Sequence, residues 1–142
     1  MKAQSINSYR FLLGAVALGM LAFTYLFQGL DYSNLVGIIS PFYKFIFNKT
    51  LRLVVNDTAC LLLIVAVFNK SGYIRVSTWL FLIELFLLLP LYLALKLFLE
   101  GTSEISSPLL SQVHRMIVNP LLMIVLMLGF IYQDYYWKKP NL

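Results

Sequence analysis

Residues 51–57 read Leu-Arg-Leu-Val-Val-Asn-Asp, and residues 114–120 read His-Arg-Met-Ile-Val-Asn-Pro. In each stretch an arginine precedes an asparagine by four positions, and a long apolar run follows. Residues i and i+4 share one face of a helix, so each stretch places a guanidinium one turn before a carboxamide on one stripe. We name them the first motif (Arg52 and Asn56) and the second motif (Arg115 and Asn119).

The composition is that of a membrane protein. The chain has 142 residues, of which 61% are hydrophobic and 12% charged, and its mean hydropathy is +0.82. A water-soluble chain of this size could not bury so much apolar surface, so we expect a lipid bilayer around it. The net charge is +5, but the lysines and arginines stand at the ends of apolar runs. That distribution is typical of membrane-flanking anchors and argues against a nucleic-acid partner.

Four apolar runs predict four membrane-spanning helices, and each motif opens one of them. The predicted spans are residues 9–28, 51–68, 76–99 and 114–133. Ser40-Pro41 is typical of a helix start, and the aromatic residues and lysines that follow it suit a lipid–water interface. We therefore predict an all-α integral membrane protein of one domain, residues 1–142. It is a four-transmembrane-helix bundle with a short interfacial helix at about 40–48 in the first loop.

Four spans place both termini on one side of the membrane. Six of the 11 lysines and arginines lie on that side, including Lys138 and Lys139, and five lie on the other. Without Arg52 and Arg115, which belong to the motifs, the distribution is six to three. Cytoplasmic loops carry the excess of positive charge, so we predict cytoplasmic termini and motifs at the outer interface.

Few polar residues occur in or near the predicted spans, and an ionisable group at the bilayer centre costs about 2.5–3.5 kcal/mol on insertion scales. We expect these residues to form one polar cluster in the outer half of the bundle. Its members are Arg52, Asn56, Asp57, Glu84, His114, Arg115 and Asn119. Two roles stay open for them. They could hold the helices together, arginine to carboxylate and asparagine to backbone freed near a proline, or they could form a site for a substrate or a partner helix.

Cys60 and His114 raise the possibility of a cysteine nucleophile with its base. However, Cys60 follows Arg52 by eight residues, which places it roughly 12 Å deeper than the interface where His114 is expected. A nucleophile and its base need about 3 Å. Cys60 is therefore interpreted as a small buried residue, and we expect neither an enzyme nor a metal or cofactor site.

Residues 113–133 carry a family resemblance. They run Val-His-Arg-Met-Ile-Val-Asn-Pro, then a long aliphatic stretch, then Tyr-Gln. This segment resembles the C-terminal segment of the exosortase F system-associated membrane proteins, which are small multispanning proteins of Bacteroidota. His114 stands where that family has the first residue of a basic pair, and Asn119 fills its amide position. The first motif is similar to the family's second-span pattern.

The resemblance implies an inner-membrane accessory protein of a protein sorting and processing system. Its partner would be exosortase F, or the membrane helix of an exosortase substrate, and the catalytic cysteine would belong to exosortase F rather than to Cys60. We expect a non-enzymatic protein that binds this partner through the polar cluster. The alternative is a small membrane transporter or ion-conducting subunit that uses Glu84 and Asp57.

Overall fold

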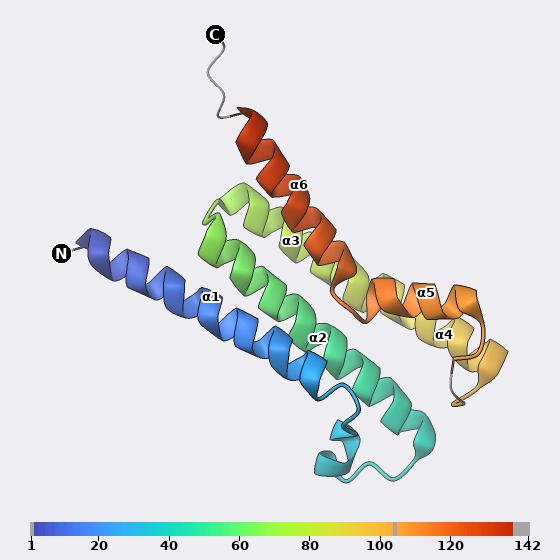
Figure 1. Cartoon of the computed structure of the whole chain (residues 1–142). Coiled ribbons are helices and arrows are strands. Elements are labelled where there is room, and N and C mark those ends of the chain that lie inside the picture. The colour runs from blue at the N-terminus through green and yellow to red at the C-terminus, as the bar shows by residue number, and fades with distance from the viewer. Residues whose placement is uncertain (1, 104, 138–142) are drawn as a thin grey trace.

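The computed structural model describes the backbone of residues 2–103 and 105–137, and the side chains from residue 8 onward in those ranges. All regular structure in this part of the chain is helical (Figure 1). In chain order the elements are α1 (Lys2–Leu26), the 3₁₀ helix η1 (Tyr32–Val36), α2 (Pro41–Val67), α3 (Ser71–Ile83), the π-helix η2 (Glu84–Leu88), α4 (Leu89–Glu100), α5 (Pro108–Ile117) and α6 (Leu121–Trp137).

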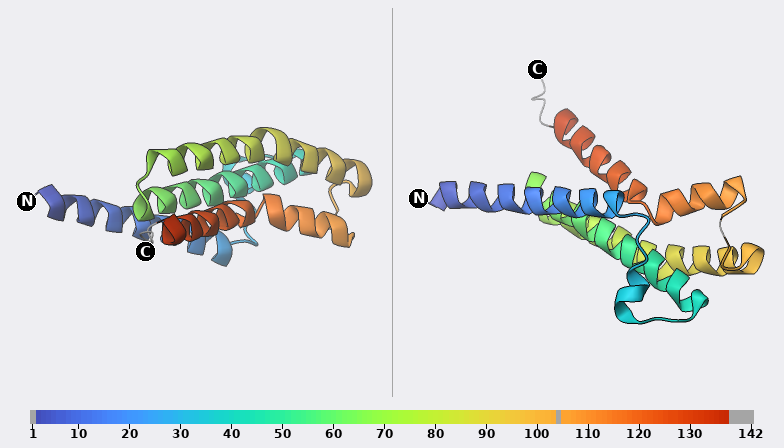
Figure 2. Two further views of the ribbon diagram at one scale, coloured as in Figure 1. Left: turned by 90° about the horizontal axis from the view of Figure 1, so that it is seen from above. Right: turned by 60° about the horizontal axis from the view of Figure 1, so that its bottom comes forward.

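Helix α2 occupies the centre of the arrangement (Figure 2). The continuous stretch α3–η2–α4 packs along one side of it and α1 along the other, and the α5–α6 arm contacts α2, α3 and α4. Helices α1 and α6 approach each other near the end of α1 and diverge toward the two termini, so that they form a V above α2. The loops at 27–40 and 101–107 share one end of the molecule, which we call the loop end.

Three helical stretches are long and apolar enough to cross a membrane: Ser8–Leu26, Pro41–Val67 and Ser71–Glu100. Helices α5 and α6 make a fourth if they count as one span across a 56° bend. Only 11% of the most apolar window of Ser8–Leu26 is buried within the protein. Such exposure suits a helix that faces lipid, because water would disfavour so much apolar surface. The fold is thus all-helical with three or four membrane-capable helices, as the sequence indicated.

The separate interfacial helix predicted at 40–48 is wrong, because these residues are the first turns of α2. Pro41 does begin the helix, as Ser40-Pro41 indicated. However, residues 48–50 read Asn-Lys-Thr and contain neither glycine nor proline, so nothing stops the i→i+4 hydrogen bonds. The ordered element of the first loop is η1 instead.

Pro90 does not interrupt the third apolar stretch. The π-helix η2 comes just before it, and the backbone N–H of Leu89 donates to the carbonyl of Glu84, five residues earlier. A proline ring clashes with the carbonyl four residues before it and offers no donor, and the wider π turn accommodates both effects. The expected distortion is therefore present, but it is spread over residues 84–88.

The core lies beside the first motif. It is formed by Leu53, Leu89, Tyr92, Leu93, Ile117 and Val118. These side chains come from α2, α4 and the end of α5, so α2 is fixed against both. This packing holds the loop end together, while α1 and most of α6 contribute little to it.

Polar contacts fasten the opposite end. Arg10 donates hydrogen bonds of 2.8 and 2.6 Å to carbonyls in the last turn of α2. Lys70 pairs with Asp134, and the hydroxyl of Tyr73 donates to the same carboxylate at 2.6 Å. Two cations that the sequence suggested as membrane anchors therefore bind other helices. Arg10 binds the carbonyls of a helix C-terminus, where a cation is favourable, and Lys70 binds a carboxylate. The anchors expected at Lys138 and Lys139 lie outside the described residues.

Candidate functional site

The first motif lies within the continuous helix α2 and joins three parts of the chain. Asn56 is buried, and its side-chain oxygen accepts a 2.6 Å hydrogen bond from the hydroxyl of Thr24 on α1. Its amide nitrogen donates at 3.2 Å to the carbonyl of Val118, just before α6. Arg52 donates to the carbonyl of Gln28 at the end of α1. Asn56 thus makes the contacts that a structural role requires.

The second motif is divided between two helices. Arg115 lies on α5, and Asn119 lies in the break between α5 and α6, where the chain bends by 56°. Pro120 lacks an N–H and clashes with the carbonyl four residues earlier, so the helix ends before it. The expectation that the second motif opens an unbroken helix is therefore wrong. Arg115 and Asn119 do not stand one turn apart on a common stripe.

The two asparagines nevertheless meet at one cavity. Arg52, Asn56 and Asn119 line a space of about 360 Å³ between α1, α2 and the start of α6. Thr24 and Gln28 add further polar groups to its wall. It lies where α1 and α6 approach each other, and we call it the vertex cavity. Three members of the predicted cluster are brought together here, and Arg115 is not among the lining residues.

Asp57 and Glu84 form a second, separate group. Both are fully buried, and each carboxyl group acts on the other as its neighbour. None of their four oxygens has a hydrogen-bond partner with good geometry among the described residues. Two carboxylates in apolar surroundings would repel each other if both were charged. The expected pairing of the arginines with these acids does not occur, because Arg52 turns to Gln28 instead.

His114 and Cys60 are not brought together as a nucleophile and base. The Nδ1 atom of His114 lies 3.0 Å from the hydroxyl of Tyr92. Cys60 is buried, and its charge environment is set by Asp57 and Glu84. Within residues 2–103 and 105–137, no group of three or more His, Cys, Asp or Glu side chains could hold a metal ion.

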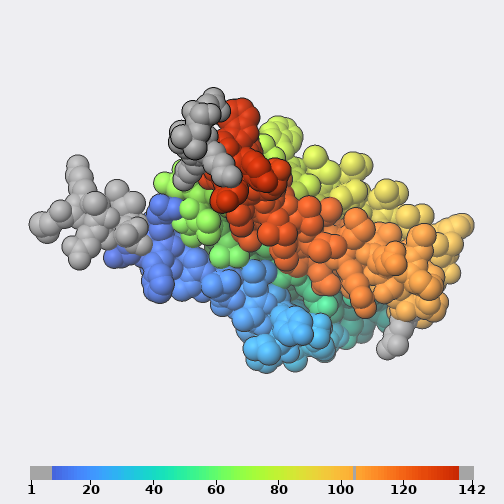
Figure 3. Space-filling view, turned by 45° about the horizontal axis from the view of Figure 1, so that its top comes forward, coloured from blue at the N-terminus to red at the C-terminus, as the bar shows by residue number. Residues whose placement is uncertain are grey.

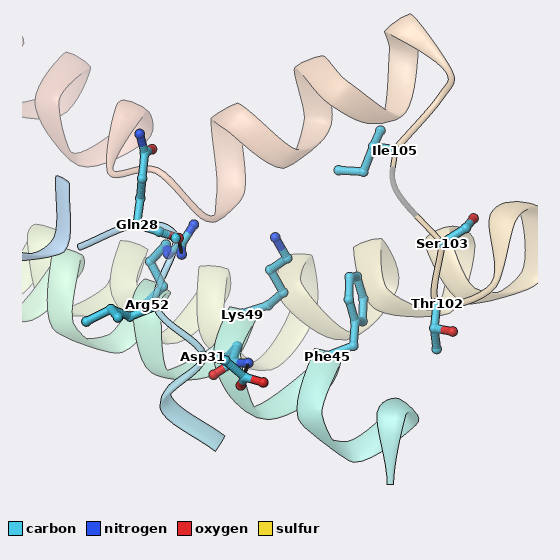
Figure 4. Close-up of a pocket in the computed structure, with 11 residues that line it drawn as sticks. Gln28, Asp31, Phe45, Lys49, Arg52, Thr102, Ser103 and Ile105 are labelled. Atoms are coloured by element: carbon cyan, nitrogen blue, oxygen red, sulfur yellow. Dashed lines mark hydrogen bonds between the residues drawn. The ribbon is translucent and has the colours of Figure 1, made fainter. Parts of the chain in front are cut away.

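A larger cavity of about 540 Å³ lies at the loop end (Figure 4). Lys49 and Arg52 extend into it from α2, and Thr102 and Ser103 border it from the loop after α4. We call it the loop-end cavity. The sequence reasoning counted Lys49 only as a membrane anchor. Its spacing of three residues before Arg52 is the signal that could have assigned it to the same helix face.

Lys96 was also expected to be a surface anchor, but it is fully buried. Its ammonium lies 3.1 Å from the carboxylate of Glu100 and donates to the carbonyl of Ser103 at 2.8 Å. Glu100 accepts hydrogen bonds from the backbone N–H groups of Ser106 at 3.2 Å and Ser107 at 2.8 Å. This network shapes the loop that borders the loop-end cavity. Its spacing of four residues, Lys96 to Glu100, is visible in the sequence.

Comparisons with protein-family models, curated proteins and solved structures gave no match. The resemblance to the exosortase F system-associated proteins therefore stays a prediction. Fold and site define a class: a small all-helical protein with membrane-capable helices and polar cavities at one end.

Proposed function

We propose that the chain is a non-enzymatic accessory protein of the bacterial inner membrane that holds one transmembrane helix of a partner protein between α1 and α6. The partner is exosortase F or the membrane helix of an exosortase substrate, as the family resemblance implies. Both termini are cytoplasmic, so the loop end faces outward. The vertex cavity carries the proposal, because it places polar groups where two membrane-capable helices diverge.

Helices α1 and α2 also form a groove nearer the termini, a cavity of about 890 Å³ lined by Ala15 and Leu18 of α1 and by Leu63 of α2. Leu63 follows Asn56 by seven residues, so both stand on the same face of α2. Part of α2 is visible between α1 and α6 in the space-filling view (Figure 3). The groove is lined mainly by apolar side chains, with Ser8 and Arg10 at its terminal end, and the polar vertex cavity lies toward its outer end. This arrangement suits a membrane helix with a polar residue near its outer end.

Co-purification in a mild detergent tests the proposal. Ala15→Trp places an indole in the groove, whereas Val16→Trp places one about 100° further around α1, at a position that does not line the groove. Both positions are exposed, so neither change disturbs the core. We expect exosortase F to co-purify with the wild type and with Val16→Trp, and at least tenfold less with Ala15→Trp. No complex with the wild type, together with normal sorting in a deletion strain, would contradict the proposal.

The pair Asp57 and Glu84 favours a second candidate function, transport of a proton or cation. Buried carboxyl groups within membrane helices are a common feature of proton pathways, and π-helices recur at functional sites. Neither residue lines the vertex or the loop-end cavity, which speaks for a structural pair. Flux into proteoliposomes that is lost in Glu84→Gln and kept in Arg75→Gln would favour transport. Absence of flux in the wild type would eliminate it.

A further inference from the structure

The loop-end cavity gathers positive charge from one face of α2. Lys49 and Arg52 are three residues apart, and both side chains extend into the cavity (Figure 4). The buried ammonium of Lys96 lies 5.8 Å from the centre of the Phe45 ring, which also lies under Lys49. Like charges held this close repel one another, so an anion among them would be stabilising.

One carboxylate, Asp31, lines the cavity, and Glu100 lies at its border, but both are already engaged. Asp31 accepts a 2.6 Å hydrogen bond from Asn48 and lies 3.8 Å from Lys44. Glu100 is held by Lys96 and by backbone N–H groups of the following loop.

That leaves the two cavity cations without an acidic partner among the described residues. Arg52 reaches a backbone carbonyl, and the ammonium of Lys49 lies 5.6 Å from the centre of the Phe45 ring. An ammonium and a guanidinium with no carboxylate form half of an anion site.

We propose that the loop-end cavity binds a phosphate-type oxyanion between Lys49 and Arg52. The guanidinium offers two parallel N–H donors, the ammonium offers a compact charge, and the hydroxyl groups of Thr102 and Ser103 border the same space. Phe45 and Ile105 supply an apolar wall, which the glycerol and acyl parts of a phospholipid could contact. The oxyanion is carried by a lipid headgroup or by a soluble phosphorylated molecule. Arg52 lines both cavities, whereas Lys49 lines only the loop-end cavity, so Lys49→Gln tests this inference separately from helix docking.

Binding is tested on the full chain in a neutral detergent, with phosphatidylglycerol, phosphatidylcholine and inorganic pyrophosphate as separate probes. Native mass spectrometry counts the bound lipid, and the shift in Tm reports stabilisation by each probe. We expect the anionic probe to bind the wild type and Arg75→Gln equally, since Arg75 is exposed at the opposite end. Lys49→Gln and Arg52→Gln should each weaken binding at least tenfold.

The outcomes separate the sources. Stabilisation by phosphatidylglycerol alone assigns the site to a lipid headgroup, and stabilisation by pyrophosphate as well assigns it to a soluble phosphorylated molecule. Equal binding of phosphatidylcholine, or equal losses in Lys49→Gln and Arg75→Gln, would overturn the proposal. Arg52→Gln removes a hydrogen bond to Gln28 and could therefore fail to fold. Lys49→Gln removes no such hydrogen bond, so it still tests the proposal in that case. Ala15→Trp, which should block helix docking, leaves this binding unchanged.

Discussion

The first motif lies inside one unbroken helix, whereas the second lies across the junction of two. The residue after each asparagine accounts for the difference: Asp57 continues α2, and Pro120 ends the helical hydrogen bonding before α6. In α2 the aligned Arg52 and Asn56 both line the vertex cavity, and Arg52 also donates to the carbonyl of Gln28 just after α1. In the second motif only Asn119 does so. The difference between Asp57 and Pro120 at this one position therefore decides whether the helix continues or bends.

The two motifs also bury different positions. In the first, Leu53 and Asn56 are buried. In the second, the equivalent Met116 is 44% exposed and Asn119 is exposed, while the residues between them are buried. Equal spacing in sequence therefore does not give equal environments, because the facing helices decide which side of each motif is covered. The first motif acts as a packed joint, and the second supplies a backbone carbonyl to that joint.

The largest expected difference between the motifs is in apolar packing. Leu53→Ala removes a fully buried side chain from the core, and such changes cost about 2–5 kcal/mol in closely packed proteins. Met116→Ala at the equivalent position should cost less than about 1 kcal/mol, because surrounding lipid replaces the lost contacts. Reversible unfolding in mixed micelles measures both. Equal losses in the two variants would show that the motifs are packed alike.

The helices themselves were predictable, because long apolar runs and their separation by polar turns need only composition. The helix start at Pro41 was predictable too. The length of α2 was missed because aromatic residues and lysines near an interface were interpreted as a surface helix, although nothing between them and Leu51 breaks a helix. The local residues thus indicated correctly where α2 begins, but the prediction that it ends near residue 48 was wrong.

The site was only partly predictable, because it depends on which helices are neighbours. Equal spacing after the arginines suggested that Asn56 and Asn119 could meet, and both line the vertex cavity. Arg52 and Lys96 each donate to a carbonyl in a loop, and the sequence does not show where such carbonyls lie. Asp57 lies near Glu84 and not beside an arginine because it stands one position beyond Asn56, about 100° around the helix.

The next effect concerns the asparagines. Asn56→Ala leaves the hydroxyl of Thr24 and the carbonyl of Val118 without their buried partner, and each lost hydrogen bond costs about 0.6–2 kcal/mol between membrane helices. We expect a total loss of about 1–3 kcal/mol in the same unfolding measurement. Asn119→Ala, its matched control, removes an exposed side chain and should be nearly neutral. A neutral Asn56→Ala would contradict the role of the first motif as a joint.

Pro120→Ala makes the second motif more like the first. Restoring an N–H at position 120 lets the helix continue, so the bend between α5 and α6 should decrease and the distance between their outer ends should increase. Spin labels at Leu109→Cys and Tyr135→Cys, in a Cys60→Ala background, measure that distance by pulsed electron resonance. The change in unfolding free energy should stay below about 1 kcal/mol. In a continuous helix the carbonyl of Val118 accepts a helical hydrogen bond, which replaces the one that it accepts from the side chain of Asn56. An unchanged distance would assign the bend to tertiary packing rather than to Pro120.

The smallest effect lies in the loop before the first motif. A single carboxylate organises each of the two loops, Asp31 before the first motif and Glu100 before the second. Hydrogen bonds from Ser33 and then Asn48 lower the pKa of Asp31 below 3.8. A depressed pKa means that the ordered loop is stabilised above the ordinary pKa of about 3.9 and loses that stabilisation as the pH falls through the lowered value. The amide signal of Ser33, which donates to this carboxylate at 3.2 Å, reports the transition in an NMR titration.

Asp31→Asn should remove this transition and leave the loop before the second motif unchanged, since Glu100 keeps its own partners. A midpoint at or above the ordinary value would mean that the hydrogen bonds to Asp31 do not favour its charged form. The same titration in Lys49→Gln tests whether Lys49, which extends into the loop-end cavity, affects the pKa of Asp31 in the bordering loop. Asp31 is held by Ser33 and Asn48 rather than by Lys49, so its midpoint should not move. A shift there would make Asp31 the counter-ion of Lys49, and the loop-end cavity would then be closed by its own loop instead of open to an anion.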